Sequence, residues 1–268
     1  SEGAKVHEIT ITVNGFEIIA EDGSSVDPND INKNVTIIGG TNQTLNITGS
    51  VRVTLDNVTL SCNTGAPIRI ANGCSPTIII KGTNNSLTAT SGNPGIWVDG
   101  DNANVKITGG GSTNSCVKIE SEAAAIGTKG GPGTSPKCGD ITIENVKITA
   151  TIKEAGAAAI GFGAAYGLGS NQKIGNITIT NSEIEAKLTE NQFFPYGAVV
   201  GGCGGGEGSY QMGDIRITTG NSSTPQNYFS KCTCGDVLVG FPSSSYNPTV
   251  NKFKIYWNGQ VQSGNITK

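Results

Sequence analysis

The chain has 268 residues, 39 of them glycine, and a formal net charge of −3 at pH 7. This balance, without any run of Lys or Arg, excludes the basic surface that nucleic-acid binding needs, and no apolar stretch approaches the roughly 20 residues that span a bilayer. We therefore expect no nucleic-acid partner and no membrane insertion. Short β-branched runs, such as residues 35–37 and 141–143, punctuate the segments rich in Gly, Asn, Thr and Ser, and they predict buried strands and not disorder.

The N-terminal segment differs from the rest of the chain. Residues 9–13 and 16–20 are both rich in β-branched and apolar residues, and Asn14-Gly15 lies between them. Asn-Gly flanked by such runs is the strongest short signal for a β-hairpin. We expect residues 1–30 to form a cap that blunts the exposed edge of the first structural repeat.

Residues 51–98 contain two consecutive units, each with three short candidate strands. The first unit has candidate strands at residues 51–55, 58–60 and 66–70, and the second has them at 77–81, 86–89 and 95–98. Alternation along a strand directs Val53 and Leu55 inward, and Arg52 and Thr54 outward. Each unit therefore has one apolar side that neighbouring units must extend into a common core.

The repeat is clearest between residues 124 and 240. Ala-Ala-Ile-Gly occurs twice and Ala-Val-Val-Gly once, each followed by a Gly-rich loop and then by Gly-Asp-Ile or Gly-Asn-Ile. The steps are 177−141=36 residues from Ile141 to Ile177, and 215−177=38 residues from there to Ile215. A period in this range indicates stacked structural repeats.

Together these patterns predict an all-β fold, a single-stranded right-handed parallel β-helix (a solenoid) that forms one domain over residues 1–268. About seven to eight coils should span residues 31–245. Residues 246–268, in which Asn258-Gly259 follows an apolar run, should form a C-terminal cap of paired strands.

Polar residues recur at two positions in the repeat. One corner is occupied by asparagines, which tolerate left-handed backbone and can hydrogen-bond to the next coil: Asn57, Asn145 and Asn181. A polar residue also follows Gly at the start of a strand, once per coil: Asp140, Asn176, Asp214 and Asp236. Because each set forms a column and not a compact cluster, we interpret both as turn and capping residues.

Three Gly-rich loops, at residues 128–138, 162–174 and 202–212, are inserted at the same place in successive coils. They should project side by side, and insertions on one face of a solenoid are often its binding face. Tyrosine gives a sugar ring an apolar face to stack on and a hydroxyl for hydrogen bonding. The alternative is that the loops are connections with incidental surface residues. The candidate ligand-binding residues are Lys129, Lys137, Tyr166, Gln172, Lys173, Glu207, Tyr210 and Gln211.

Residues 99–104 read Asp-Gly-Asp-Asn-Ala-Asn and offer several oxygen ligands. Such ligands suit Ca²⁺, and Asp99 and Asp101 are the candidate metal ligands. The segment lacks the glutamate that closes an EF-hand loop, and Asp-Gly between two strands is also an ordinary turn. Beyond this Ca²⁺ site, we expect no cofactor.

An odd number of cysteines leaves at least one thiol without an intrachain partner. Two interpretations stay open: disulfides across adjacent coils, with Cys62–Cys74 the simplest to close, or small buried residues of the stack. The seven cysteines are Cys62, Cys74, Cys116, Cys138, Cys203, Cys232 and Cys234.

The unit of Ala-Ile-Gly, Gly-rich loop and Gly-Asp-Ile-Thr-Ile resembles a family of secreted or surface right-handed β-helix proteins of Bacteroidetes and related anaerobes, over roughly residues 51–240. The resemblance implies an extracellular or cell-surface location and a carbohydrate-binding or adhesin-like role. The wider fold is shared with pectate lyases and polygalacturonases. The polygalacturonase motifs are missing, since the sequence has no Asp-Asp, no histidine besides His7 and no Arg-x-Lys.

We therefore predict a non-catalytic extracellular glycan-binding or adhesin-like protein whose partner is a polysaccharide or a host glycan. The alternative is a polysaccharide lyase or glycosidase whose carboxylates come together from different coils. Clustered carboxylates with strongly shifted pKa values in a groove would favour the enzyme.

Overall fold

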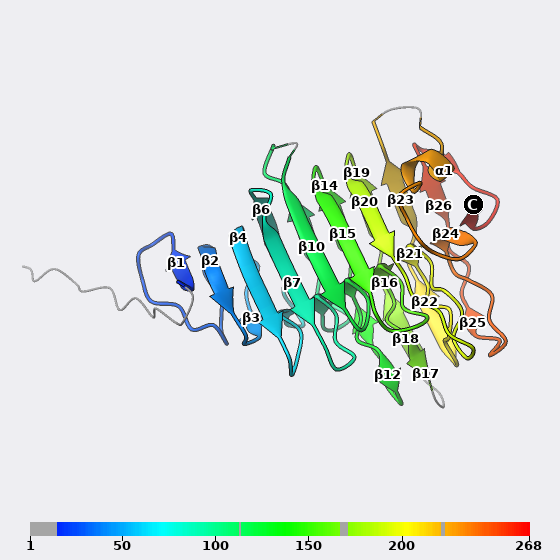
Figure 1. Ribbon diagram of the computed structural model, residues 1–268, viewed down its shortest axis with the longest axis horizontal. Helices are drawn as coiled ribbons and strands as arrows, with labels where there is room; N and C mark the ends of the chain where they lie inside the picture. Colours follow the sequence, from blue (N-terminus) through cyan, green and yellow to red (C-terminus); the bar gives the residue numbers. More distant parts are fainter. Residues whose placement is uncertain (1–14, 113, 167–170, 221–222) are drawn as a thin grey trace, which may run out of the picture.

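The computed structural model describes residues 15–112, 114–166, 171–220 and 223–268. This part of the chain is all-β, and its only helix is the four-residue α1 (Pro225–Tyr228). Within these ranges no helix has the length and apolar composition required to cross a membrane. The strands lie side by side along the longest axis of the molecule, from β1 (Glu17–Ala20) at the N-terminal end to the C-terminus at the other (Figure 1).

The largest sheet has 14 strands, and one set of them repeats the first strand position of each structural repeat. Ile141 pairs with Val105 on one side and with Ile177 on the other, and Ile177 pairs with Ile215. The 36- and 38-residue steps of the sequence are thus confirmed as parallel, in-register stacking. The set consists of β2 (Val35–Thr41), β4 (Arg52–Cys62), β6 (Thr77–Lys81), β9 (Val105–Thr108), β14 (Ile141–Glu144), β19 (Ile177–Thr180), β23 (Ile215–Thr218) and β26 (Ile255–Trp257).

A second set of parallel strands follows the first around a corner, and β4 is long enough to belong to both. It consists of the second half of β4 with β7 (Asn85–Ala89), β10 (Cys116–Ser121), β15 (Lys147–Ile152) and β20 (Glu183–Lys187). We call one strand from each set, with its connections, a level of the stack.

Asparagines with left-handed backbone make this corner, as predicted: φ is 51° at Asn57, 51° at Asn145 and 45° at Asn181. Glycine takes the corner in other levels. A Cβ on Gly82 would lie 2.5 Å from Asn57 Oδ1, so the asparagine side chain of one level packs on the bare glycine of the next. Asn57 Oδ1 accepts a hydrogen bond from the backbone N–H of Asn84.

A third position forms a separate eight-stranded sheet. Its strands pair in parallel apart from the last, which is antiparallel to its neighbour. The inward residues Ile68, Ile96, Ile126 and Ile160 stack directly on one another, and each is at most 1% exposed. The strands are β3 (Leu45–Ile47), β5 (Ile68–Ile70), β8 (Ile96–Val98), β11 (Ile126–Gly127), β16 (Ile160–Gly161), β21 (Val200–Gly201), β24 (Val237–Gly240) and β28 (Ile266–Thr267).

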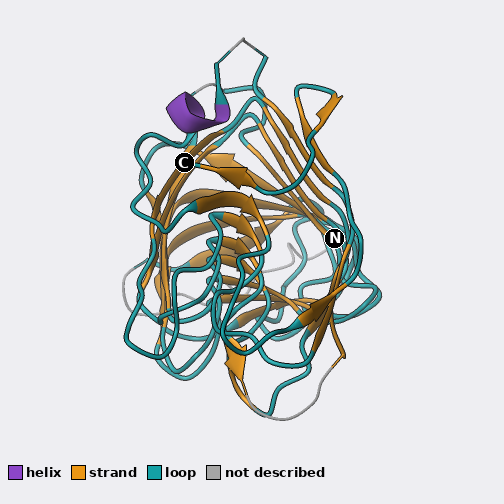
Figure 2. Ribbon diagram, turned by 90° about the vertical axis from the view of Figure 1, so that its right-hand side faces the viewer, coloured by secondary structure: helices purple, strands orange, loops and turns teal. Residues whose placement is uncertain are grey.

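The aliphatic core lies between these sheets, and Figure 2, which looks along the stack, shows the strands arranged around a common interior. A column of side chains ties the levels together where the first strands begin. Asn104 Oδ1 accepts from the Asp140 N–H (2.7 Å), Asp140 Oδ1 from the Asn176 N–H (2.8 Å) and Asn176 Oδ1 from the Asp214 N–H (2.9 Å). The capping role expected of these residues is confirmed. Asp236 was wrongly grouped with them, because it precedes β24 in the eight-stranded sheet.

Both ends of the stack carry antiparallel strands. Residues 9–13 of the predicted hairpin lie outside the described residues, but β1 pairs antiparallel with β2 and covers that edge. At the other end β27 (Gln260–Val261) folds back on β26 after Asn258-Gly259, as predicted. The outer boundaries of the caps and coils stay a prediction.

All seven cysteines are free, and six of them are buried. The structure therefore agrees with the interpretation as small core residues. Cys62 illustrates the point, because its thiol contacts the hydroxyl of Thr44 (3.5 Å) and forms no bond to Cys74.

Candidate functional site

Glycine determines where the three Gly-rich loops leave the eight-stranded sheet. Gly127, Gly161, Gly201 and Gly240 pair with one another in register, and their φ angles lie between 126° and 142°. A Cβ on Gly127 would come within 2.0 Å of the Gly161 carbonyl oxygen. Only glycine allows this approach, so every loop starts at the same point of its level.

The predicted adjacency of the loops is confirmed. The first two pair through β12 (Gly131–Pro132) and β17 (Ala165–Tyr166). All three contribute to a four-stranded parallel sheet, which we call the loop sheet. It consists of β13 (Lys137–Cys138), β18 (Asn171–Ile174), β22 (Ser209–Met212) and β25 (Thr249–Val250).

Three of the predicted ligand-binding residues form one exposed row on the loop sheet. Lys137 pairs with Lys173, which pairs with Gln211, and all three side chains are exposed. A parallel row contains Asn171 and Ser209, whose side chains are hydrogen-bonded at 2.8 Å. The loop sheet thus presents hydrogen-bonding groups at the strand spacing of ~4.8 Å.

Two other predicted residues do not lie on that surface. Tyr210 and Gln172 are each 1% exposed, and Tyr210 packs edge-on against Phe162 and Phe241, with ring centroids 5.1 and 4.9 Å apart. Burial raises the pKa of the Tyr210 hydroxyl, which lies 3.6 Å from the Cys203 thiol. These side chains form the loops' own core, and no sugar can stack on Tyr210.

The remaining predicted residues are scattered. Tyr166 pairs with Pro132 through its backbone, but its side chain lies outside the described part of the structure. Glu207 is half-buried. Lys129 lies apart from the exposed row, where its ammonium sits over the Trp97 ring at 5.4 Å, as does the Arg69 guanidinium.

The two candidate Ca²⁺ ligands face cations. Asp99 Oδ2 accepts from Arg69 Nε at 2.8 Å, and the Asp101 carboxylate lies 3.9 Å from both Lys137 Nζ and Lys173 Nζ. Among the described residues no group of three or more His, Cys, Asp or Glu side chains could hold a metal ion. These contacts favour the alternative interpretation of the segment as a charged turn.

A groove that no sequence motif indicates lies on the opposite edge of the stack. Its lining includes the first residues of β10, β15 and β20 and the corner before them. These strands begin toward the upper edge of Figure 1, whereas the loop strands lie toward the lower edge. Its volume is about 730 Å³, within the ~300–1,000 Å³ of typical ligand sites. Its lining residues are Thr83, Asn114, Cys116, Asn145, Val146, Lys147, Asn181 and Glu183.

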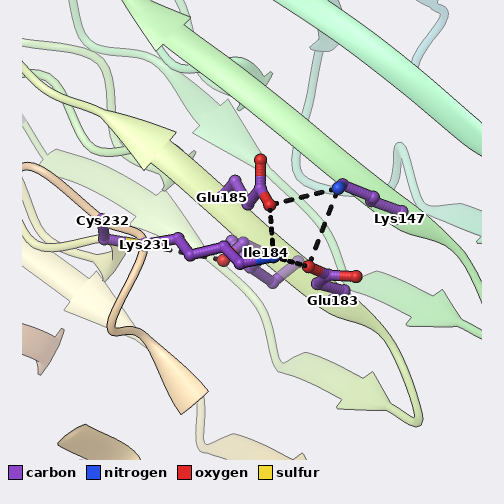
Figure 3. A network of polar contacts seen from close by, with 6 residues as sticks. All are labelled: Lys147, Glu183, Ile184, Glu185, Lys231 and Cys232. Atoms are coloured by element: carbon purple, nitrogen blue, oxygen red, sulfur yellow. Dashed lines mark hydrogen bonds and ion pairs between the residues drawn. The ribbon is translucent and has the colours of Figure 1, made fainter. Parts of the chain in front are cut away.

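Two lysines and two glutamates form a closed network beside this groove (Figure 3). Lys147 Nζ lies 3.1 Å from Glu185 and 3.7 Å from Glu183, and Lys231 Nζ lies 3.0 and 2.9 Å from the same carboxylates. The hydrogen bond that Lys147 donates to Glu185 raises the pKa of Lys147. The hydrogen bond from Lys231, and then that from Lys147, lower the pKa of Glu185. The two formal positive charges of the network balance its two formal negative charges.

A pair of carboxylates lies beyond the ends of β10 and β15. Glu122 Oε2 accepts a hydrogen bond from the Gly92 N–H at 3.0 Å. Burial, and secondarily the negative charge of Glu122, raise the pKa of Glu154. A carboxyl group with a raised pKa beside a second carboxylate is an arrangement found in many acid–base sites.

Comparison of the chain with protein-family models, with curated proteins and with solved structures gives no match. The resemblance to surface β-helix proteins of Bacteroidetes therefore stays a prediction, based on the residue pattern of the repeat.

Proposed function

We propose that the chain is a single-stranded right-handed parallel β-helix at the cell surface or outside the cell, and that its loop sheet binds a glycan without turnover. The fold proposal is supported by the parallel register of successive levels in all three strand positions. The functional proposal rests on one observation. Lys137, Lys173 and Gln211 come from three loops of three levels, yet lie in one exposed row.

The charges of this row indicate which glycans suit it. Two lysines face a single carboxylate, that of Asp101, so one positive charge is left over. Side-chain exposures of 47% for Lys137 and 46% for Lys173 leave both ammonium groups accessible. Because neighbouring strands are ~4.8 Å apart, the row can follow successive units of a glycan chain. We therefore assign it an acidic polysaccharide, such as one that contains uronic acids.

The test is binding of an oligogalacturonate hexasaccharide to the chain, measured by calorimetry at two salt concentrations. Removing two exposed ionic contacts, each worth ~0.2–1 kcal/mol, in Lys137→Ala/Lys173→Ala should weaken binding about tenfold. The remaining affinity should depend less on salt.

Lys118→Ala/Lys187→Ala provides the control, because both lysines are exposed on the largest sheet, away from the loop sheet. This variant should bind like the parent chain. Equal binding by the parent and the Lys137→Ala/Lys173→Ala variant would remove the loop sheet as the site.

The second candidate function is a glycosidase, which the Glu122–Glu154 pair favours. The raised pKa of Glu154 suits a general acid, and a second carboxylate nearby suits a nucleophile or base. Product analysis after incubation with a bound polysaccharide separates the two functions, since only an enzyme releases oligosaccharides.

A further inference from the structure

We propose that the corner groove is a second ligand site, independent of the loop sheet, and that it takes a neutral oligosaccharide. It lies on the opposite edge of the stack and shares no residue with the loop sheet. Three features of the groove support this site: its amide side chains, its balanced charge and one accessible thiol.

The groove presents two exposed side-chain amides, those of Asn145 and Asn181. Within the described ranges, neither side chain has a hydrogen-bond partner. Asn57 has the same corner backbone, but its amide is engaged by the N–H of Asn84 and by Asp56. A side-chain amide offers both a donor and an acceptor, so Asn145 and Asn181 present two such pairs one strand spacing, ~4.8 Å, apart.

The charge of the groove favours a neutral ligand. Lys147 is held between Glu183 and Glu185, and Lys231 completes the network (Figure 3). An acidic ligand would have to displace a glutamate from Lys147, and a basic ligand would have to displace a lysine. Hydroxyl groups can instead bond to the exposed amides and to the remaining carboxylate lone pairs of Glu183 without breaking an ion pair.

The lining also disfavours apolar and aromatic ligands. Its one aliphatic residue, Val146, is 3% exposed, and none of the groove's described lining residues is aromatic. A ligand rich in hydroxyls therefore fits the groove better than a peptide with apolar anchors, which needs apolar pockets.

Cys116 gives the groove a built-in reporter. It pairs with Lys147 in register and lines the groove, and it is half-exposed, whereas the other six cysteines are buried. Iodoacetamide should therefore alkylate Cys116 first in the folded chain. An occupied groove should slow this reaction, and Cys116→Ser should abolish it.

The experiment measures the rate of Cys116 alkylation by peptide mass spectrometry. The ligands are neutral hexasaccharides of β-1,4-linked glucose, mannose and xylose, tested one at a time. At least one of them should slow alkylation about fivefold or more at saturation. Asn145→Gly/Asn181→Gly should abolish this protection, since glycine keeps the left-handed corner and removes only the amides.

Two matched variants should retain the protection. Asn57→Gly makes the same change at the same corner outside the groove, and Lys137→Ala/Lys173→Ala removes the charged row of the loop sheet. Failure of all three hexasaccharides to protect Cys116, or protection that persists in Asn145→Gly/Asn181→Gly, would overturn the assignment. Neither result affects the loop sheet, which is tested by its own variant and an acidic ligand.

Discussion

Glu154 links the charge state of a single residue to the stability of the fold. Its raised pKa means that the folded chain keeps this proton to a higher pH than the unfolded chain, whose Glu titrates near ~4.3. The folded state then binds more protons, so stability falls as pH rises through the folded pKa. Glu154→Gln removes this loss, and we expect it to be more stable than the parent at pH 7 and equally stable well below pH ~4.

Urea unfolding of both chains at the two pH values measures the effect. The exposed Glu190 provides the control, because Glu190→Gln should change stability by the same small amount at both pH values. A stabilisation by Glu154→Gln that does not depend on pH would contradict this explanation.

Single positions also show what the sequence could and could not predict. The alternation of side chains along β22 directs Met212 inward, and Tyr210, two residues before it, must point the same way. The same rule directs Gln172 inward with Ile174. The burial of Tyr210 and Gln172 was therefore predictable once the loops were recognised as strands. Their residue types alone suggested a binding surface.

At the scale of elements, the glycine at the end of each short strand allows successive levels of the eight-stranded sheet to approach closely where the loops begin. At Gly161 φ is 137°, and a Cβ would lie 2.1 Å from the Gly201 carbonyl oxygen. Gly161→Ala should therefore lower the free energy of unfolding by about 3 kcal/mol or more, through backbone strain and overlap together. Thermal unfolding measures this loss.

Gly131→Ala is the matched comparison, because φ there is 110° and nothing lies within 4 Å of the added Cβ. It should suffer the strain without the overlap, at a cost of about 1–3 kcal/mol. Equal losses in the two variants would show that the close approach between levels contributes nothing.

Element register was the most predictable property of this chain. The 36-residue step places Ile141 on Ile177 without further information. The corner groove was not predictable, because its lining residues come from several levels and from turns between strands. The pattern along one strand carries no information about how side chains of different levels lie relative to one another.

At the scale of the whole molecule, three asparagines of the C-terminal segment close the stack. Asn265 Oδ1 accepts from the Phe241 N–H (3.0 Å), and its Nδ2 donates to the Phe241 carbonyl (2.8 Å). Asn251 makes the same pair of bonds with Met212, at 2.7 and 2.9 Å. Asn258 Oδ1 accepts from the Thr219 N–H (2.8 Å). Each amide takes the place that the peptide group of a further level would occupy.

Asn265→Ala should leave the Phe241 peptide group unpaired and lower stability by about 1–3 kcal/mol. An uncovered strand edge also invites a second chain, so light scattering should reveal association that increases with concentration. Gln260→Ala, in the exposed strand β27, should do neither. A stable and monomeric Asn265→Ala would show that the antiparallel strands alone close this end.

The column from Asn104 through Asp140 and Asn176 to Asp214 ends on the backbone N–H of Lys254. Each member accepts the backbone N–H of the next level through its Oδ1, so the junctions of this column repeat one hydrogen bond. Duplication or loss of a whole period during evolution would keep this hydrogen bond. The length of such a molecule can therefore change in steps of ~4.8 Å, one strand spacing at a time. Only the two capped ends must remain unique.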